Sequence, residues 1–405
     1  MSLATHVHNF SSVVIFLLVA FFSTEGRAAD SKYFVFIGTY TGKGSQGIYA
    51  YRFDPRVGEL KSAGLAAETE NPSFLAADPK GRFLYAVNEI DHFKDDNASR
   101  DAKASKELKT GEVKTGAVSA FSIDQESGKL KLLQQVASLG AGPAHISLDK
   151  TGRYVLVANY DGGNVAAFPI KDSGELGPHS AFQQEAGMSV NRERQEGPHA
   201  HEILTSNDNR FALSADLGTD QLLVYRFNAR TGSLTPNDPA FAKVKPGSGP
   251  RHFAFAPSGK FLYLANEMAS TVTVFSFDAR SGTLQSKQTI STLSKSFKGL
   301  NEVAEIAIDG KGKSLYVSNR GDDSIAVFKI NHADGTLSFV ERVASGGKTP
   351  RHFALDPSGK WLLAANQESD NIQLFRVDAD TGRLTASSQV TNILSPVCII
   401  FVPIK

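Results

Sequence analysis

Apolar and polar residues alternate in short runs along most of this chain, and the runs are rich in β-branched and aromatic residues. Alternation with a period of two is typical of half-buried strands, and no long stretch shows the 3.6-residue period of an amphipathic helix. Short polar segments such as PSGK, DKTG and DGKG separate the runs, and their composition is that of hairpin turns. The pattern therefore predicts an all-β protein built from antiparallel hairpins.

One unit recurs along the chain. It has a strand that opens with Pro, a polar turn with Gly, an apolar strand that ends in Ala-Asn or Ser-Asn, and further strands around an Asp/Gly turn; the best copies span residues 249–284 and 349–384. The equivalent turns are marked by Gly81, Gly152, Asn209, Gly259, Gly312 and Gly359. They recur about every 50 residues, which is the period of propeller blades rather than of helical solenoids.

The two ends of the repeat region complement each other. Residues 33–60 supply three strands of a unit without the innermost strand, and PVCIIFVP at 396–403 has the pattern of a lone innermost strand. Pairing of 396–403 with 33–39 would complete a seventh unit and remove exposed strand edges. We therefore predict an all-β, seven-bladed β-propeller over residues 30–405, a single domain whose ring is closed by the C-terminal strand pairing with the N-terminal blade.

Two segments fall outside the repeat. Residues 11–22 are uninterruptedly apolar or small, and small residues follow at 28–29, which is typical of a cleavable signal peptide over 1–29. A membrane anchor is the alternative, although the apolar run is short for a bilayer. We expect a periplasmic or secreted protein that has no membrane contact after cleavage. Residues 92–115, rich in Lys, Asp and Ser, are expected to form an exposed insertion loop.

Composition narrows the function classes. A net charge of +1 gives no long-range attraction to nucleic acid or anionic membranes, so no nucleic-acid partner is expected. The single cysteine, Cys398, excludes an internal disulfide and a cysteine-rich metal site, and its apolar surroundings predict a core position. His199 and His201 could share a strand face as metal ligands do, but no carboxylate set accompanies them. No metal or other cofactor is therefore expected.

Polar residues concentrate where innermost strands begin and second strands end, and in a propeller these places meet at one end of the central axis. Hairpin register pairs Arg251 with Glu267 and Glu302 with Arg320. In each of the dipeptides Arg251-His252 and Arg351-His352, we expect one side chain to point into the blade. Such pairs can be salt bridges that only stabilise the ring. Buried charges gathered in one place, however, reduce the stability of the folded protein unless they are paired or serve in binding or catalysis.

The segments GPAHISLDKTGRYVLVANYDGGNVAAF, GPRHFAFAPSGKFLYLANE and SLYVSNRGDDSIAVF resemble propeller-type 6-phosphogluconolactonases, and they are similar to the related fungal carboxy-cis,cis-muconate cyclases. The resemblance covers about residues 33–403. It implies catalytic roles for the four residues at matching positions, which are His201, Arg251, Glu267 and Arg320. Further polar residues at the same end of the axis are expected to bind the substrate: His145, His199, Glu302, Arg351 and Asn159.

The resemblance implies hydrolysis of a sugar lactone, a small-molecule substrate, in carbohydrate metabolism. Arg251 and Arg320 would hold an anionic group or stabilise the oxyanion, and His201 or Glu267 would act as general base. Two alternatives stay open: a cycloisomerase that forms or opens a lactone by proton transfer, and a non-catalytic propeller that binds a ligand. Export fits poorly with a phosphorylated intermediate of central metabolism, so the phosphorylation state of the substrate is also open.

Overall fold

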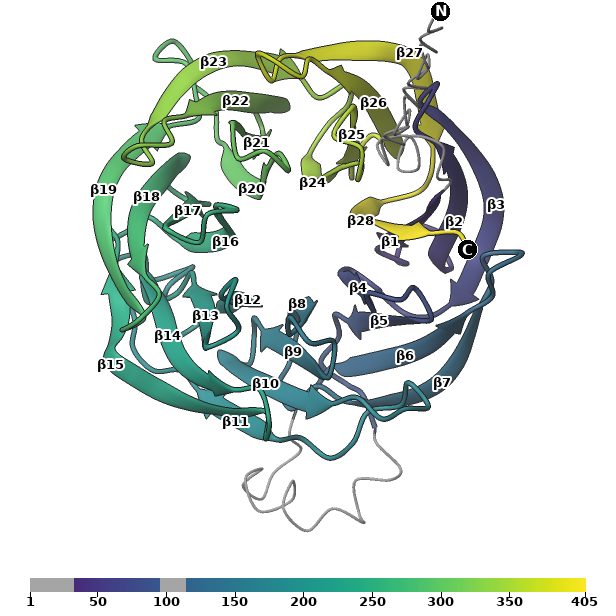
Figure 1. Ribbon diagram of the computed structural model, residues 1–405, viewed down its shortest axis with the longest axis horizontal. Helices are drawn as coiled ribbons and strands as arrows, with labels where there is room; N and C mark the ends of the chain where they lie inside the picture. The colour runs from purple at the N-terminus through teal and green to yellow at the C-terminus, as the bar shows by residue number, and fades with distance from the viewer. Residues whose placement is uncertain (1–32, 95–113) are drawn as a thin grey trace, which may run out of the picture.

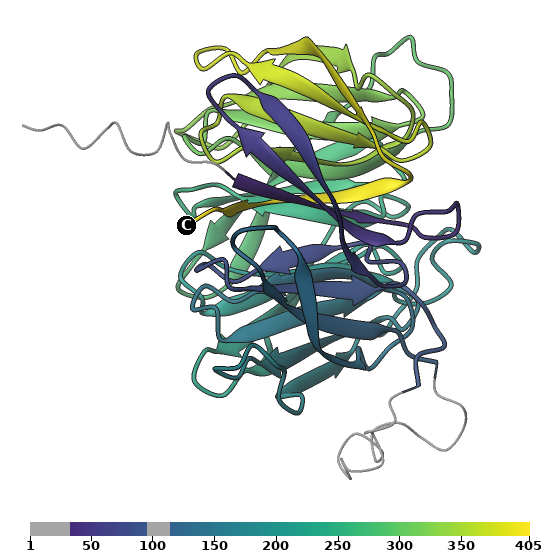
Figure 2. The ribbon, with the colours of Figure 1, turned by 90° about the vertical axis from the view of Figure 1, so that its right-hand side faces the viewer.

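The structure is a computed structural model that describes residues 33–94 and 114–405. These residues form seven four-stranded antiparallel sheets around a central axis (Figure 1), and Figure 2 shows the ring edge-on. The predicted fold class is confirmed. Within the described ranges no helix is long and apolar enough to cross a bilayer. The signal peptide at 1–29 and most of the loop at 92–115 lie outside the described residues, so both remain predictions.

The blades are numbered here in chain order, each strand with its bounds. Blade 1 contains β28 (Pro396–Pro403), β1 (Tyr33–Thr39), β2 (Gly47–Asp54) and β3 (Glu59–Glu68). Blade 2 contains β4 (Leu75–Ala77), β5 (Phe83–Asn88), β6 (Ala117–Ile123) and β7 (Leu130–Ala137). Blade 3 contains β8 (Pro143–Leu148), β9 (Tyr154–Asn159), β10 (Asn164–Pro169) and β11 (Ala181–Gln184). Blade 4 contains β12 (Ala200–Thr205), β13 (Phe211–Asp216), β14 (Gln221–Asn228) and β15 (Ser233–Lys243).

The remaining blades have the same strand order, innermost strand first. Blade 5 contains β16 (Pro250–Phe255), β17 (Phe261–Asn266), β18 (Thr271–Asp278) and β19 (Thr283–Ser291). Blade 6 contains β20 (Glu302–Ile308), β21 (Ser314–Arg320), β22 (Ser324–Ile330) and β23 (Leu337–Ala344). Blade 7 contains β24 (Pro350–Leu355), β25 (Trp361–Asn366), β26 (Asn371–Val377) and β27 (Leu384–Asn392).

Blade 1 joins the two ends of the described chain. β28 pairs antiparallel with β1 in a register that runs from Tyr33↔Pro403 to Thr39↔Pro396. The predicted pairing of 396–403 with 33–39 is therefore confirmed, and it leaves β1 with a hydrogen-bonded neighbour on each side. Cys398, on β28, is fully buried as predicted.

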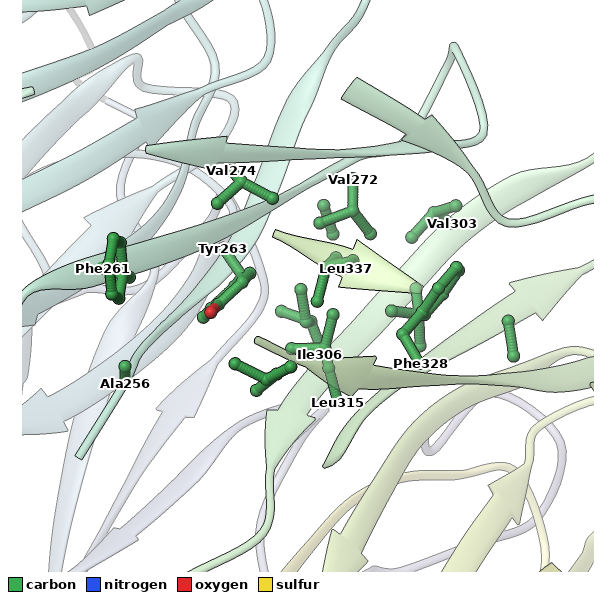
Figure 3. Packing of buried hydrophobic residues seen from close by; sticks show 14 residues of the cluster. Ala256, Phe261, Tyr263, Val272, Val274, Val303, Ile306, Leu315, Phe328 and Leu337 are labelled. Carbon is green, nitrogen blue, oxygen red and sulfur yellow. The ribbon is translucent and has the colours of Figure 1, made fainter. Parts of the chain in front are cut away.

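Apolar residues fill the space between neighbouring blades. The second strand of blade 5, β17, is buried along its whole length because both faces of its sheet are covered. Figure 3 shows the cluster between blades 5 and 6, in which Tyr263 and Val272 lie near Ile306 and Phe328. A comparable cluster lies between every other pair of adjacent blades, including blades 7 and 1. Each blade is therefore packed against both of its neighbours through apolar side chains.

In most blades, a glycine in the turn between the third and fourth strands packs closely against an aromatic ring of the preceding blade. Gly335 has a φ of 79°, and a Cβ built there would lie 2.4 Å from Cδ1 of Phe261. Equivalent contacts with a ring of the preceding blade join Gly58 to Trp361, Gly128 to Phe34, Gly174 to Phe83, Gly232 to Tyr154 and Gly282 to Phe211. Only glycine combines this backbone conformation with so close an approach of a ring.

Candidate active site

Three of the predicted site residues occupy the same place in their blades. The pairing of the innermost strand with the second strand shifts register between Ala200 and Glu202 in β12. The same shift recurs after Pro250 in β16 and after Pro350 in β24. Residues within these irregularities include His201, Arg251 and Arg351. Bulges turn side chains out of the regular alternation and are common beside active sites.

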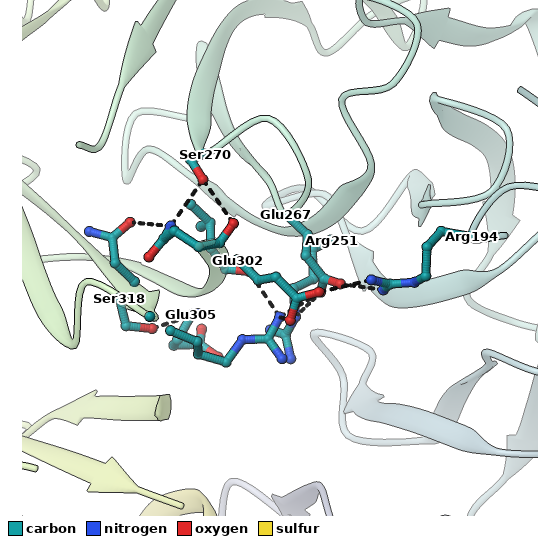
Figure 4. Close-up of polar contacts among 12 residues, drawn as sticks. Arg194, Arg251, Glu267, Ser270, Glu302, Glu305 and Ser318 are labelled. Carbon is teal, nitrogen blue, oxygen red and sulfur yellow. Dashed lines mark hydrogen bonds and ion pairs between the residues drawn. The ribbon is translucent and has the colours of Figure 1, made fainter. Parts of the chain in front are cut away.

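The carboxylate of Glu267, which is 3% exposed, is the centre of an ion-pair cluster (Figure 4). Its Oε2 lies 3.0 Å from Nε of Arg251 and 2.8 Å from Nη2 of Arg320. Its Oε1 accepts a hydrogen bond of 2.6 Å from Nη2 of Arg194. The predicted proximity of Arg251 and Glu267 is confirmed, and three cations from different parts of the chain meet on one carboxylate.

Glu302 provides the second carboxylate of the cluster. It faces Arg320 in the register of β20 and β21, as predicted, with 3.4 Å between Oε2 and Nη2. Its Oε1 accepts a hydrogen bond of 2.8 Å from Nη1 of Arg194. Unlike Glu267, the side chain of Glu302 is 41% exposed, so it lies at the rim of the cluster.

The charges around Glu267 fix its protonation state. Burial alone would raise the pKa of this carboxyl, but Arg320, Arg251 and Arg194 outweigh burial and hold the pKa well below its ordinary value. Glu267 is therefore a carboxylate across the neutral range. A carboxylate with so low a pKa is a weak base, and its main effect is to hold arginines in place.

His201 has the opposite character. It is 5% exposed, and its ring lies edge-to-face on Tyr160 and His252, with centroids 5.5 and 5.0 Å away. Burial, and then the charge of Arg251, lower the pKa of His201 well below 6.5 despite the opposing effect of Glu267. Its buried Nδ1 has no hydrogen-bond partner among the described residues. His201 is thus a neutral imidazole with a free ring nitrogen, which is what a general base requires.

The arginines offer unused donors beside His201. In the described structure, Nη1 of Arg251 and Nε of Arg320 are buried and make no hydrogen bond, whereas Nε of Arg251 faces Oε2 of Glu267. Burial, reinforced by Arg320 and Arg351, lowers the pKa of Arg251 to about 10, so it stays protonated near neutrality. Buried donors without partners are costly unless a ligand uses them. The cluster is therefore suited to bind an anion or a developing oxyanion.

Arg351 adds a cation from blade 7. Its guanidinium lies 5.3 Å from the ring centroid of Tyr40, whose hydroxyl donates to Oε2 of Glu89 at 2.8 Å. Among the described residues, no carboxylate forms an ion pair with Arg351. Although burial would lower the pKa of Arg351, Tyr40 and Glu89 raise it. Arg351 is thus a charged group that no carboxylate among the described residues neutralises directly.

A second cluster lies about one residue further along the innermost strands. Phe74, which precedes β4, touches the rings of His145, His252 and His352, with centroids 4.4, 5.6 and 5.5 Å away. These rings come from blades 3, 5 and 7, so the cluster lies on the axis itself. His252 Nδ1 and His352 Nε2 lie 3.0 and 3.5 Å from Oε2 of Glu305.

Both histidines of the two Arg-His dipeptides therefore point toward the axis. The prediction that one residue of each dipeptide points into the blade is wrong, because the register irregularity at Arg251 and Arg351 lets two consecutive side chains turn the same way.

Within the described residues, no group of three or more His, Cys, Asp or Glu has the arrangement of a metal site.

The other predicted substrate-binding residues are placed differently. His145 belongs to the axial cluster, with Nε2 3.5 Å from Oε1 of Glu202. His199 stacks on Tyr160, with ring centroids 4.5 Å apart, beside the ion-pair cluster. Asn159 is fully buried and donates to the carbonyl of Ser138 and to Oδ1 of Asn164. These hydrogen bonds join the end of β9 to β10 and to the connection that enters blade 3 from blade 2, and they give no support to the prediction that Asn159 binds substrate.

Arg194 is a residue of the cluster that the repeat pattern does not predict. It lies in the connection between β11 and β12, outside the repeated strands, where neither period nor hairpin register specifies position. Its backbone N–H donates to Oδ1 of Asn191, and the neighbouring Gln195 is fully buried and donates to the carbonyl of Leu217. The length of this connection, on the face where the innermost strands begin, is the signal that could have indicated it.

The geometry defines a class: a closed seven-bladed propeller with a buried arginine–glutamate–histidine site at one end of its axis. The family model described as "Lactonase, 7-bladed beta-propeller" matches residues 34–401, and the chain belongs to this family. It is 34% identical to the 6-phosphogluconolactonase of Bacillus subtilis, over 92% of this chain and 99% of that protein. It is also 34% identical to the periplasmic gluconolactonase of Pseudomonas aeruginosa, whose structure superposes with a TM-score of 0.82 over 93% of this chain and 100% of that one.

Proposed function

We propose that this protein hydrolyses a sugar lactone to its hydroxy acid, with His201 as the general base. The observation that carries the proposal is that neutral His201, with an Nδ1 that has no partner among the described residues, lies within the field of Arg251, whose Nη1 also has none. A base and a cationic donor next to each other are the two elements that ester hydrolysis requires. The names of the relatives agree with this chemistry.

In the proposed reaction, His201 removes a proton from water as the water oxygen bonds to the lactone carbonyl carbon. The carbonyl oxygen gains negative charge, which the free N–H groups of Arg251 and Arg320 stabilise. The ring C–O bond then breaks, and the imidazolium of His201 returns the proton to the departing ring oxygen. Glu267 keeps both arginines in position and stays ionised throughout.

The location and phosphorylation state of the substrate form the second part of the proposal. The sequence at 1–29 is typical of a signal peptide, and one structural relative is a periplasmic gluconolactonase. We propose that the protein is exported and that its substrate is an aldonolactone. Since other relatives are named for a phosphorylated lactone, both glucono-1,5-lactone and its 6-phosphate belong in the test.

The experiment measures acid release from each lactone by the purified protein, with spontaneous hydrolysis subtracted. The wild type should accelerate hydrolysis of at least one lactone, and His201→Asn should lower kcat by about 100-fold or more. His332→Asn is the control, because His332 is an exposed histidine in the connection between β22 and β23 and belongs to neither the ion-pair cluster nor the axial cluster. Equal activity of His201→Asn and the wild type would contradict the mechanism, and no acceleration by the wild type would contradict the function.

A further inference from the structure

We propose that Arg194 is an exchangeable cation: in the empty site it pairs with Glu267 and Glu302, and when substrate binds it transfers to an anionic group of the substrate. Arg194 would then determine the preference of this site for anionic over neutral sugar lactones. The inference rests on the proposed lactone substrate, and it assigns a role to a residue outside the repeated strands.

Position and exposure distinguish Arg194 from the other arginines on the same carboxylates. The side chains of Arg251 and Arg320 are 3% and 11% exposed and project from strands β16 and β21. The side chain of Arg194 is 37% exposed and projects from a loop that lies between blades 3 and 4. The pair with Glu302 is partly exposed on both sides, at 37% and 41%, and such a pair is weak compared with a buried one. The pair with Glu267 is exposed on the Arg194 side only, but Glu267 keeps two other arginines when Arg194 changes partner.

The cluster stays neutralised when Arg194 leaves. Glu267 keeps Arg251 at 3.0 Å and Arg320 at 2.8 Å, and Glu302 keeps Arg320 at 3.4 Å. The oxygens that Arg194 releases are Oε1 of Glu267 and Oε1 of Glu302. Both are strong acceptors, and the hydroxyl groups of a sugar are donors of the right kind. Exchange therefore replaces each lost contact with one to the substrate.

The loop fixes the backbone of Arg194, so a change of partner requires movement of the side chain only. The backbone N–H of Arg194 donates to Oδ1 of Asn191 at 3.1 Å, and the backbone N–H of Gln195 donates to the carbonyl of Asn191 at 2.7 Å. Buried Gln195 ties this turn to Leu217 in blade 4. Beyond the two carboxylates, the guanidinium donates one further hydrogen bond among the described residues, to the hydroxyl of Tyr160 at 3.4 Å. From this fixed turn, the long side chain of Arg194 can reach a ligand at the end of the axis.

The test compares binding of two ligands that differ by one phosphate, 6-phosphogluconate and gluconate, by isothermal titration calorimetry. The variants are Arg194→Gln, Arg194→Lys and the matched control Arg192→Gln. Arg192 is an exposed arginine of the same loop, so its replacement changes the net charge equally. The wild type should bind 6-phosphogluconate at least 10-fold more tightly than gluconate. Arg194→Gln should reduce that ratio about 10-fold, Arg194→Lys should keep part of it, and Arg192→Gln should leave it unchanged.

The outcomes separate this proposal from the proposed function. A ratio that survives in Arg194→Gln, an equal loss of affinity for both ligands, or the absence of a preference in the wild type would each overturn the assignment of Arg194. An Arg194-dependent preference in a protein that hydrolyses neither lactone would support the assignment and contradict the hydrolase. In an active enzyme, Arg194→Gln should raise KM for the 6-phosphate about 10-fold, with little change in kcat and little change in KM for the neutral lactone.

Discussion

Nε of Arg251 lies 3.0 Å from Oε2 of Glu267, with both side chains almost fully buried. Replacing the carboxylate in Glu267→Gln leaves the charge of Arg251 buried without compensation. We expect the free energy of unfolding to fall by about 3–5 kcal/mol. Glu302→Gln removes a half-exposed carboxylate from the same cluster. This substitution should change the free energy of unfolding by at most about 1 kcal/mol. Urea denaturation of both variants measures the difference, and similar values would contradict the central position of Glu267.

The pH dependence of activity should reflect the lowered pKa of His201. A base is lost when it is protonated, so kcat/KM should stay level as the pH falls through 6.5 and should decline only at lower pH. After burial, the charge of Arg251 is the second cause of the lowered pKa of His201. Arg251→Met removes this charge, so the pKa of His201 should rise. We therefore expect the acid limb of this variant to move to higher pH, whatever its remaining activity. An unchanged limb would exclude His201 as the titrating base.

Stability should depend on pH through Glu305, which faces His252, His352 and the charge of Arg251. Burial raises the pKa of Glu305 from 4.5 to about 8, so between these values the folded protein holds a proton that the unfolded chain releases. The contribution of Glu305 is complete below about pH 4.5, and it decreases by about 1.4 kcal/mol per pH unit until the pH reaches about 8.

Glu305→Gln carries no titratable group at this position, while the neighbouring histidines titrate in both proteins. The free energy of unfolding of the wild type minus that of the variant should therefore fall steadily between about pH 5 and pH 8. Urea denaturation of both proteins across that pH range measures this difference. A difference that does not change with pH would mean that Glu305 is ionised in the folded protein.

The glycine contacts between blades give a prediction about packing. Gly335→Ala adds a methyl group 2.4 Å from the ring of Phe261 at a φ of 79°, and we expect a loss of about 2–4 kcal/mol. Gly359→Ala is the matched control: its φ is 69°, but nothing lies within 4 Å of the added carbon, so it should lose only about 1 kcal/mol of backbone strain. Thermal and urea denaturation of the two variants separate crowding from strain.

Much of this fold was predictable because its pattern of strands and turns repeats along the sequence. The spacing of the turns predicted the blades, and the missing innermost strand of blade 1 predicted the pairing of β28 with β1. Counting residues around a hairpin turn placed Arg320 opposite Glu302. These inferences need only strand geometry, which short alternating sequences specify well.

The parts that were not predicted depend on irregular backbone. The bulges that turn His252 and His352 toward the axis break the alternation on which the prediction relied. Arg194 reaches the cluster through the Asn191 turn and the anchor of Gln195, and neither has a counterpart in the repeated unit. Asn159 stands at the end of a strand like the site residues, but its hydrogen bonds brace blade 3. Position in a repeat does not distinguish a brace from a ligand-binding group.

The pairing of β28 with β1 has a consequence for biosynthesis. β28 follows the strands of blades 2 to 7 in the chain, so blade 1 lacks its innermost strand until these eight residues have been synthesised. Until then the edge of β1 is open to any other extended chain, which is a hazard for aggregation. A nascent chain held unfolded until β28 has emerged would avoid this exposure, and the pairing of β28 with β1 would then complete the ring.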